Sequence, residues 1–156
     1  MAAWQWHSEW MLAAPVDAVW QAIAHPETWP AWWPYVAYAK RLCAGDANDV
    51  GARYRFVWRT RLPYQIRFDT EVQQVEKHRL LVARALGEVV GTGTWQLAPC
   101  VGGTRVAYDW HIELASGWKR VLAPVLAAVY QWNHDGVMRA GQAGLARYLE
   151  TQHDPG

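Results

Sequence analysis

The stretch APVDAVWQAIAHPETWPAWWP, Ala14–Pro34, decides the fold class because it reads as two short helices separated by prolines. A first helix is predicted over about Pro15 to Ala24, since proline is favoured at a helix start and apolar side chains follow at helical spacing. Pro26 ends this helix because its ring cannot continue the hydrogen-bond ladder. A second short helix is predicted over about Glu27 to Trp33.

Strands are predicted on both sides of this stretch. Before it, apolar and polar side chains alternate from Trp4 to Leu12, which is the period of a strand with one buried face. After it, the same alternation recurs in runs joined mostly by short turns, which indicates an antiparallel sheet. These runs cover about 53–61, 65–73, 80–86, 89–97 and 104–114.

A long helix is predicted to close the chain, because from about Trp118 to Leu149 the apolar positions return to a period of 3.6. Three small residues, Gly136, Ala140 and Gly144, form a stripe that lets neighbouring backbone approach closely or leaves space beside it. The arc expected to face the sheet comprises Leu122, Leu126, Val129, Asn133, Gly136, Val137, Ala140 and Gly144.

This order of elements resembles the helix-grip fold of the SRPBCC superfamily, which includes START lipid-transfer domains, birch-pollen-type allergens and polyketide cyclases or dehydrases. The resemblance spans about Trp4 to Tyr148 and implies an α+β fold. In that fold a curved antiparallel sheet of six to seven strands wraps a long C-terminal helix, with two short helices after the first strand. The segments that carry the resemblance are Ala14–Pro34, GTGTWQL (Gly91–Leu97), GGTRVAYDW (Gly102–Trp110) and WNHDGVMRAGQAGLARYL (Trp132–Leu149).

Length and charge narrow the class of partner. A chain of 156 residues fits one domain, so we expect a single START-like ligand-binding domain over residues 1–156. Its 15 basic and 14 acidic residues give a net charge of +1, which argues against nucleic acid as a partner. The N-terminus lacks a signal-peptide pattern, and the longest apolar run, VLAPVLAAVY, is too short to span a bilayer. We therefore expect a cytoplasmic monomer or weak homodimer without stable membrane insertion.

The resemblance also implies a cavity that commonly holds a hydrophobic ligand, and aromatic side chains fall on the strand faces expected to line it. Such bulky walls favour a flat or small ligand, with Tyr108 and the indole groups as its few polar contacts. The alternative is that these rings pack solidly against the closing helix. The predicted ligand-binding residues are Trp32, Trp33, Phe56, Trp58, Ile66, Phe68, Trp95, Tyr108, Trp110 and Asn133.

Trp32 and Trp33 have two interpretations. The resemblance implies that the short helices close one end of the fold, so these side chains would lie at the cavity mouth as a lid. Otherwise they plug the core between the short helices and the sheet. Because adjacent residues of a short helix point in different directions, we expect one to pack inward and the other to lie at the entrance.

The polar residues supply no recognisable active site. Four arginines, at positions 53, 55, 59 and 61, form a basic strip, but acidic residues on neighbouring strands favour a cross-strand charge ladder over a phosphate site. In the sequence Asn133-His134-Asp135, adjacent helical residues diverge by about 100°, which is poor geometry for a catalytic triad. Asn133 projects into the inward arc and His134 lies near its edge. We expect Asn133 to be buried and hydrogen-bonded to a strand or a water.

No metal or cofactor site is predicted, because neither the histidines nor Cys43 and Cys100 have metal-ligand spacing. Three functions stay open. The first is binding or carriage of a hydrophobic small molecule, whether aromatic, polyketide-like or lipid-like. The second is a polyketide cyclase, aromatase or dehydratase that uses the same cavity. The third is a protein-binding module with a filled aromatic core.

Overall fold

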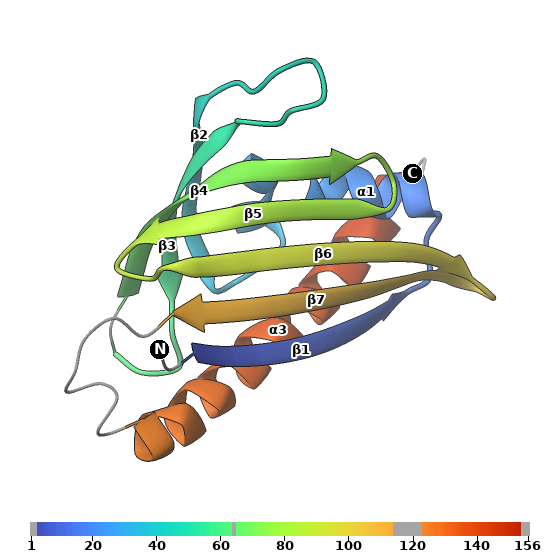
Figure 1. Ribbon diagram of the computed structural model, residues 1–156. Helices are drawn as coiled ribbons and strands as arrows, with labels where there is room; N and C mark the ends of the chain where they lie inside the picture. The colour runs from blue at the N-terminus through green and yellow to red at the C-terminus, as the bar shows by residue number, and fades with distance from the viewer. Residues whose placement is uncertain (1–2, 64, 114–122, 154–156) are drawn as a thin grey trace.

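Seven antiparallel strands form one curved sheet in the part of the chain that the computed structural model describes, residues 3–63, 65–113 and 123–153 (Figure 1). Strands and helices follow the order β1 (Ala3–Leu12), α1 (Val16–Ile23), the 3₁₀ helix η1 (Pro26–Ala31), β2 (Val36–Cys43), β3 (Arg53–Arg59), β4 (Gln65–Glu76), β5 (Leu80–Gly87), β6 (Gly91–Cys100), β7 (Gly103–Glu113) and α3 (Ala123–His153). The expected helix-grip fold is therefore confirmed.

The strand order is β1-β7-β6-β5-β4-β3-β2. Strands β2 to β7 are thus consecutive neighbours, and β1 joins the far side of β7, where Trp6 pairs with Trp110 and Trp10 with Val106. The sheet curves around α3, which runs across its inner side (Figure 1). The tryptophans of the first strand are consequently brought beside the last strand and the closing helix.

Strand β2 was not anticipated from the sequence. It lies at the edge of the sheet, where Val36 is buried while most of the residues after it are exposed. An edge strand with so little buried surface shows no alternation of apolar and polar residues. Its pairing with β3 is also irregular, with register shifts after Val36 and after Arg41.

The predicted phase of the closing helix is wrong by about 100°, or one residue. The residues of α3 that are buried against the rest of the protein are Val137, Met138, Gly141, Leu145 and Leu149. The small-residue stripe lies to one side of this face. A Cβ at Gly136 would meet the Arg61 side chain, and one at Gly144 would meet the Trp32 backbone carbonyl.

Several residues of the predicted inward arc are therefore less buried than expected. Val129 is 38% exposed, although the arc was expected to face the sheet. Gly136, Ala140 and Gly144 are only half-buried. Trp118 and Leu122 lie outside the described residues, as does the side chain of Leu126.

The outer face of the sheet carries the predicted charge ladder. Arg53 lies 2.9 Å from the Glu71 carboxylate and Arg55 lies 3.0 Å from that of Asp69, each across the β3–β4 pair. Arg59 and Arg61 are exceptions. Arg59 donates to the Pro34 carbonyl oxygen at 2.8 Å, and Arg61 follows β3 and turns to α3. Its guanidinium lies 3.6 Å from the centroid of the Trp132 ring and donates to the Trp132 carbonyl oxygen at 3.0 Å.

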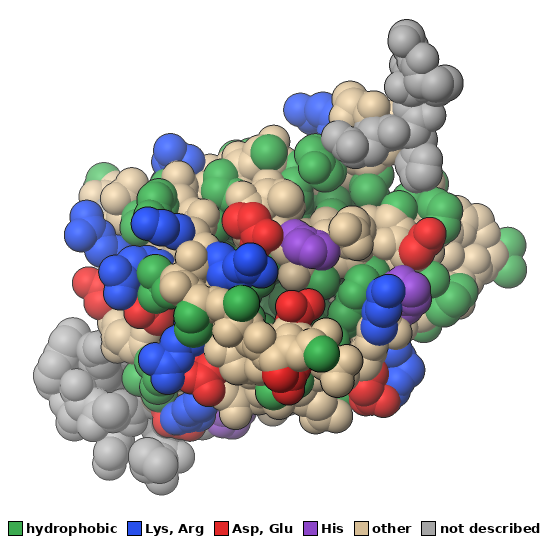
Figure 2. Space-filling model, turned by 90° about the horizontal axis from the view of Figure 1, so that it is seen from above, with side chains coloured by type: hydrophobic (Ala, Val, Ile, Leu, Met, Phe, Trp, Pro, Cys, Tyr) green, Lys and Arg blue, Asp and Glu red, His purple; other side chains and the backbone are tan. Residues whose placement is uncertain are grey.

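Basic and acidic side chains are interspersed over the face shown in Figure 2, without a large patch of either sign. This mixture agrees with the near-neutral net charge of +1. Among the described helices, none combines the length and the apolar character that a bilayer crossing requires.

Candidate functional site

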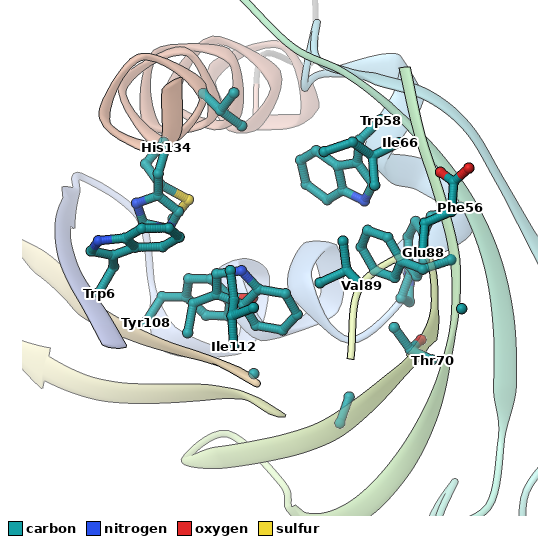
Figure 3. Close-up of a pocket in the computed structure, with 18 of the residues that line it drawn as sticks. Trp6, Phe56, Trp58, Ile66, Thr70, Glu88, Val89, Tyr108, Ile112 and His134 are labelled. Carbon is teal, nitrogen blue, oxygen red and sulfur yellow. The ribbon is translucent and has the colours of Figure 1, made fainter. Parts of the chain in front are cut away.

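A cavity of about 580 Å³ lies between the inner face of the sheet and α3 (Figure 3). All seven strands except β2 contribute to its wall, together with η1 and the middle of α3. The wall is dominated by rings, which come from Trp4, Trp6, Trp29, Trp33, Tyr54, Phe56, Trp58, Phe68, Trp95, Tyr108, Trp110 and Tyr130. The aromatic side chains on the inner strand faces thus surround an open space rather than filling it.

The open end of the cavity lies away from the short helices. Its exposed lining residues are Arg59, Gln65, Gly87 and Glu88, which come from the ends and connections of β3 to β6. The opposite end is lined by buried residues, including Trp29 and Trp33. The expectation that the short helices frame the mouth is therefore wrong, because they lie where the sheet and α3 converge.

Trp29 and Trp33 form the closed end of the cavity. The ring centroid of Trp33 lies 5.4 Å from that of Trp10 and 4.8 Å from that of Trp58. Its Nε1–H donates to the Val137 carbonyl oxygen of α3 at 2.8 Å. Trp29 is fixed in a similar way, since its Nε1–H donates to the Ala22 carbonyl oxygen at 3.1 Å. This cluster joins η1, the sheet and α3.

Neither Trp32 nor Trp33 occupies an entrance. Trp32 is 4% exposed and Trp33 is 1% exposed, and their rings stack with centroids 5.4 Å apart and an interplanar angle of 15°. Trp33 lines the cavity, whereas Trp32 does not. The expected division into one inward and one entrance residue is wrong because the two rings stack as one buried unit between η1 and α3.

Nine of the ten predicted ligand-binding residues line the cavity, and Trp32 is the exception. Contact of any of them with a ligand stays a prediction. The nine are Trp33, Phe56, Trp58, Ile66, Phe68, Trp95, Tyr108, Trp110 and Asn133.

Asn133 is half-buried, and its Oδ1 accepts a hydrogen bond from the Arg61 backbone N–H at 2.7 Å. Asn133 is thus hydrogen-bonded as expected, but its partner lies just after the end of β3 and its side chain is only half-buried. The neighbouring His134 also lines the cavity, although the sequence placed it only at the edge of the inward arc. Its ring lies against Trp6, with centroids 5.2 Å apart.

Several wall residues were not selected from the sequence. Trp4, Trp6 and Tyr130 lie near the start of the closing helix, with the ring centroids of Trp4 and Tyr130 5.0 Å apart. The alternation of tryptophans in β1 was a usable signal, because it marks one face as aromatic. The missing step was the pairing of β1 with β7, which brings that face to the cavity.

The buried polar groups of the wall are neutral. Burial lowers the pKa of His134 to about 4, with Asp135 opposing the shift, so its imidazole is uncharged at neutral pH. Burial likewise raises the pKa of the Tyr108 hydroxyl, which stays protonated. Trp58 Nε1 and both ring nitrogens of His134 are buried and find no hydrogen-bond partner in the described part of the chain.

Comparison with solved structures supports the fold. The Zhui aromatase/cyclase from Streptomyces sp. R1128 is similar with a TM-score of 0.75, at 14% identity and over 99% of this chain and 98% of that chain. A START superfamily protein from Mycobacterium smegmatis gives a TM-score of 0.74 at 13% identity, over 94% and 98% of the two chains. At such low identities the likeness concerns the fold alone.

The di-domain ARO/CYC BexL from the BE-7585A biosynthetic pathway gives a TM-score of 0.74 at 15% identity. The match covers 95% of this chain and 50% of the BexL chain. The chain thus spans half the length of BexL. No curated protein matches the sequence. A family model described as polyketide cyclase/dehydrase and lipid transport matches residues 5–150. Because this match covers nearly the whole sequence, the chain belongs to the polyketide cyclase/dehydrase and lipid transport family.

Proposed function

We propose that the protein binds a flat, uncharged, largely aromatic small molecule in the cavity between the sheet and α3. The observation that carries this proposal is the combination of about 580 Å³ of space with a wall made mostly of aromatic rings. Ligand pockets commonly have volumes of about 300 to 1,000 Å³ and apolar walls with few polar groups. Rigid rings on opposite walls suit a planar ligand, which they can contact by offset stacking.

Charge supports the same choice of ligand. Lining residues with a formal charge, Arg59, Glu88 and Glu113, are at least partly exposed. Two of them are already engaged within the protein, since Arg59 donates to the Pro34 carbonyl oxygen and Glu88 accepts from the Arg67 backbone N–H. A charged ligand would lose its hydration in the interior without gaining an opposite charge, which is strongly unfavourable.

Native mass spectrometry of the freshly purified chain tests the proposal most directly. We expect a co-purified mass that is released by denaturation and that competes with an added uncharged aromatic probe such as N-phenyl-1-naphthylamine. Titration should also quench the tryptophan emission, because rings of seven tryptophans line the cavity. Absence of a bound mass together with unchanged emission at saturating probe would contradict the proposal.

A second candidate function is cyclisation or dehydration of a polyketide-like substrate in the same cavity. The family description and the aromatase/cyclase neighbours favour it, as does the presence of the Tyr108 hydroxyl and the His134 imidazole in one wall. A protonated Tyr could donate a hydrogen bond to an oxygen that gains charge during the reaction. However, a base with a pKa of about 4 is weak at neutral pH, so His134 suits binding better than proton abstraction.

This second candidate has a separate test. A synthetic poly-β-ketone thioester would be incubated with the protein, and the formation of ring products followed by absorbance and mass. Acceleration over buffer that is lost in Tyr108→Phe would support catalysis. Tight binding of the substrate without acceleration would leave carriage as the function.

A further inference from the structure

Three buried nitrogen atoms beside the cavity need an explanation. Trp58 Nε1 and the two ring nitrogens of His134 have no hydrogen-bond partner among the described residues. A buried polar group without a hydrogen-bond partner is destabilising, so folded proteins contain few of them. Trp32 Nε1 is the fourth buried side-chain atom without a partner among the described residues, but Trp32 does not line the cavity. Trp58 and His134 both line it, so a ligand can approach their rings.

The two side chains lie on opposite walls. Figure 3 shows His134 beside Trp6 on α3's side of the open space, and Trp58 beside Ile66 across from it. Trp58 comes from β3 and His134 from the middle of α3. A ligand that satisfies both must therefore span the cavity and carry a polar group at each end.

The chemistry of each group defines what it can bind. An indole N–H only donates, so Trp58 requires an acceptor oxygen or nitrogen. A neutral imidazole has its donor and its acceptor on different ring nitrogens that point apart, so one hydroxyl can pair with either nitrogen but not with both. No charged side chain stands among the buried lining residues of the described chain. Phenolic hydroxyls fit both positions, because each can donate and accept without carrying charge.

We infer that Trp58 and His134 are specificity-determining residues that select a neutral aromatic ligand with hydroxyl groups at its two ends. This inference rests on the proposed function, because it assigns the ligand class of the same cavity. All three nitrogens are buried in the orientations seen here, so contact with a ligand requires the two rings to turn toward the cavity that they line. Apolar polycyclic compounds would enter the cavity but could not form a hydrogen bond with Trp58 or with His134.

Calorimetric titration with a matched series of ligands tests this inference. The series is naphthalene, 2-naphthol, 2,6-dihydroxynaphthalene and 2-naphthalenesulfonate. For the wild-type chain we expect the affinity to rise roughly three- to tenfold with each hydroxyl, since that is the net effect of one hydrogen bond. The sulfonate should bind most weakly because its charge would be buried without a partner.

Variants test whether each of the two residues accounts for the gain in affinity from one hydroxyl, called a step below. Trp58→Phe and His134→Phe should each reduce the gain in affinity from naphthalene to 2,6-dihydroxynaphthalene by about one step, whatever effect the altered ring has on the binding of naphthalene itself. His134→Gln should retain the step, because an amide still donates and accepts. Trp132→Phe and His111→Phe are matched controls, since neither residue lines the cavity. Thermal melting verifies folding, and the two Phe variants should melt no lower than the wild type because each removes an unpaired polar group.

The outcomes separate this inference from the proposed function. Equal affinities for naphthalene and its hydroxyl derivatives, or a uniform loss of affinity in the Phe variants, would overturn the selectivity while leaving aromatic binding intact. Preferential binding of the sulfonate would overturn the requirement for a neutral ligand. Failure of the whole series to bind would overturn both.

Discussion

The Tyr108 hydroxyl lies directly over Gly93, where an added Cβ would come within 2.8 Å of its oxygen. Both residues line the cavity, and they occupy the adjacent strands β7 and β6. Gly93 therefore provides the space that lets the Tyr108 ring lie against the inner face of the sheet instead of projecting into the cavity.

Gly93→Ala should push the Tyr108 ring toward the cavity and reduce the space for a ligand. We expect roughly tenfold weaker binding of an aromatic probe and a loss of about 1 to 3 kcal/mol in the free energy of unfolding, as for other overpacked sites. Tyr108→Phe on the same background removes the closest atom and should restore most of both losses. A double-mutant cycle measures this coupling. Additive effects of the two changes would show that the contact is unimportant.

Gly144 and Gly136 should respond differently to the same substitution. A Cβ at Gly144 would clash with the Trp32 carbonyl oxygen, so Gly144→Ala forces the backbone just after η1 away from α3. We expect a loss of about 3 kcal/mol in the free energy of unfolding. The atoms nearest to a Cβ at Gly136 belong to the Arg61 side chain, which can move.

Gly136→Ala should therefore change the free energy of unfolding by less than about 1 kcal/mol, because the helix propensity of Ala offsets the displaced Arg61. Denaturant unfolding of the two variants gives the comparison. Equal effects at the two sites would contradict the observed orientation of α3.

Trp32 and Trp33 should behave as core residues with unequal effects on binding. Replacing either by Ala removes a fully buried ring and should lower the free energy of unfolding by about 3 to 5 kcal/mol. Trp33→Ala should also weaken probe binding, because Trp33 lines the cavity and Trp32 does not. Melting curves and probe dissociation rates separate the two effects. Fast dissociation from a Trp32→Ala variant of normal stability would instead support a lid.

The sequence predicted the elements that bury one regular face. The alternation in β3 and β4 identified both the inward rings and the outward charge ladder, because burial on one side imposes a period of two. Strand β2 escaped prediction since an edge strand with one buried residue near its start carries no such pattern. A regular pattern thus requires a continuous buried face.

The phase of α3 shows a different limit. Val129 is apolar but 38% exposed, so it biases a projection that assumes apolar residues point inward. Glycines on the same helix supply no side chain to mark a direction. As a result His134 was placed at the edge of the arc, whereas the structure places it in the cavity wall. The position of the mouth was missed for a related reason, because it depends on the curvature of the sheet rather than on any local pattern.

Burial of His134 should make stability depend on pH. The pKa of this group is about 4 in the folded chain, mainly because of burial, against a value of 6.5 for the free side chain. Between these two values the unfolded state binds more protons than the folded state, so the free energy of unfolding falls as the pH is lowered from 6.5 to 4. The full loss below pH 4 is about 3 kcal/mol, and no loss from this group occurs above pH 6.5.

His134→Phe isolates this contribution because it removes the titrating group and keeps an aromatic ring of similar size. The difference in the free energy of unfolding between the variant and the wild type should be constant above pH 6.5 and should grow in favour of the variant below it. Other titrating groups, including the carboxylates and His7, are common to both proteins and cancel in the difference. Urea unfolding at half-unit intervals from pH 4 to 8 measures the curve, with His111→Phe as the exposed control. A difference that does not change with pH would mean that the His134 imidazole is not held neutral by burial, and would remove the electrostatic basis for a neutral ligand at that wall.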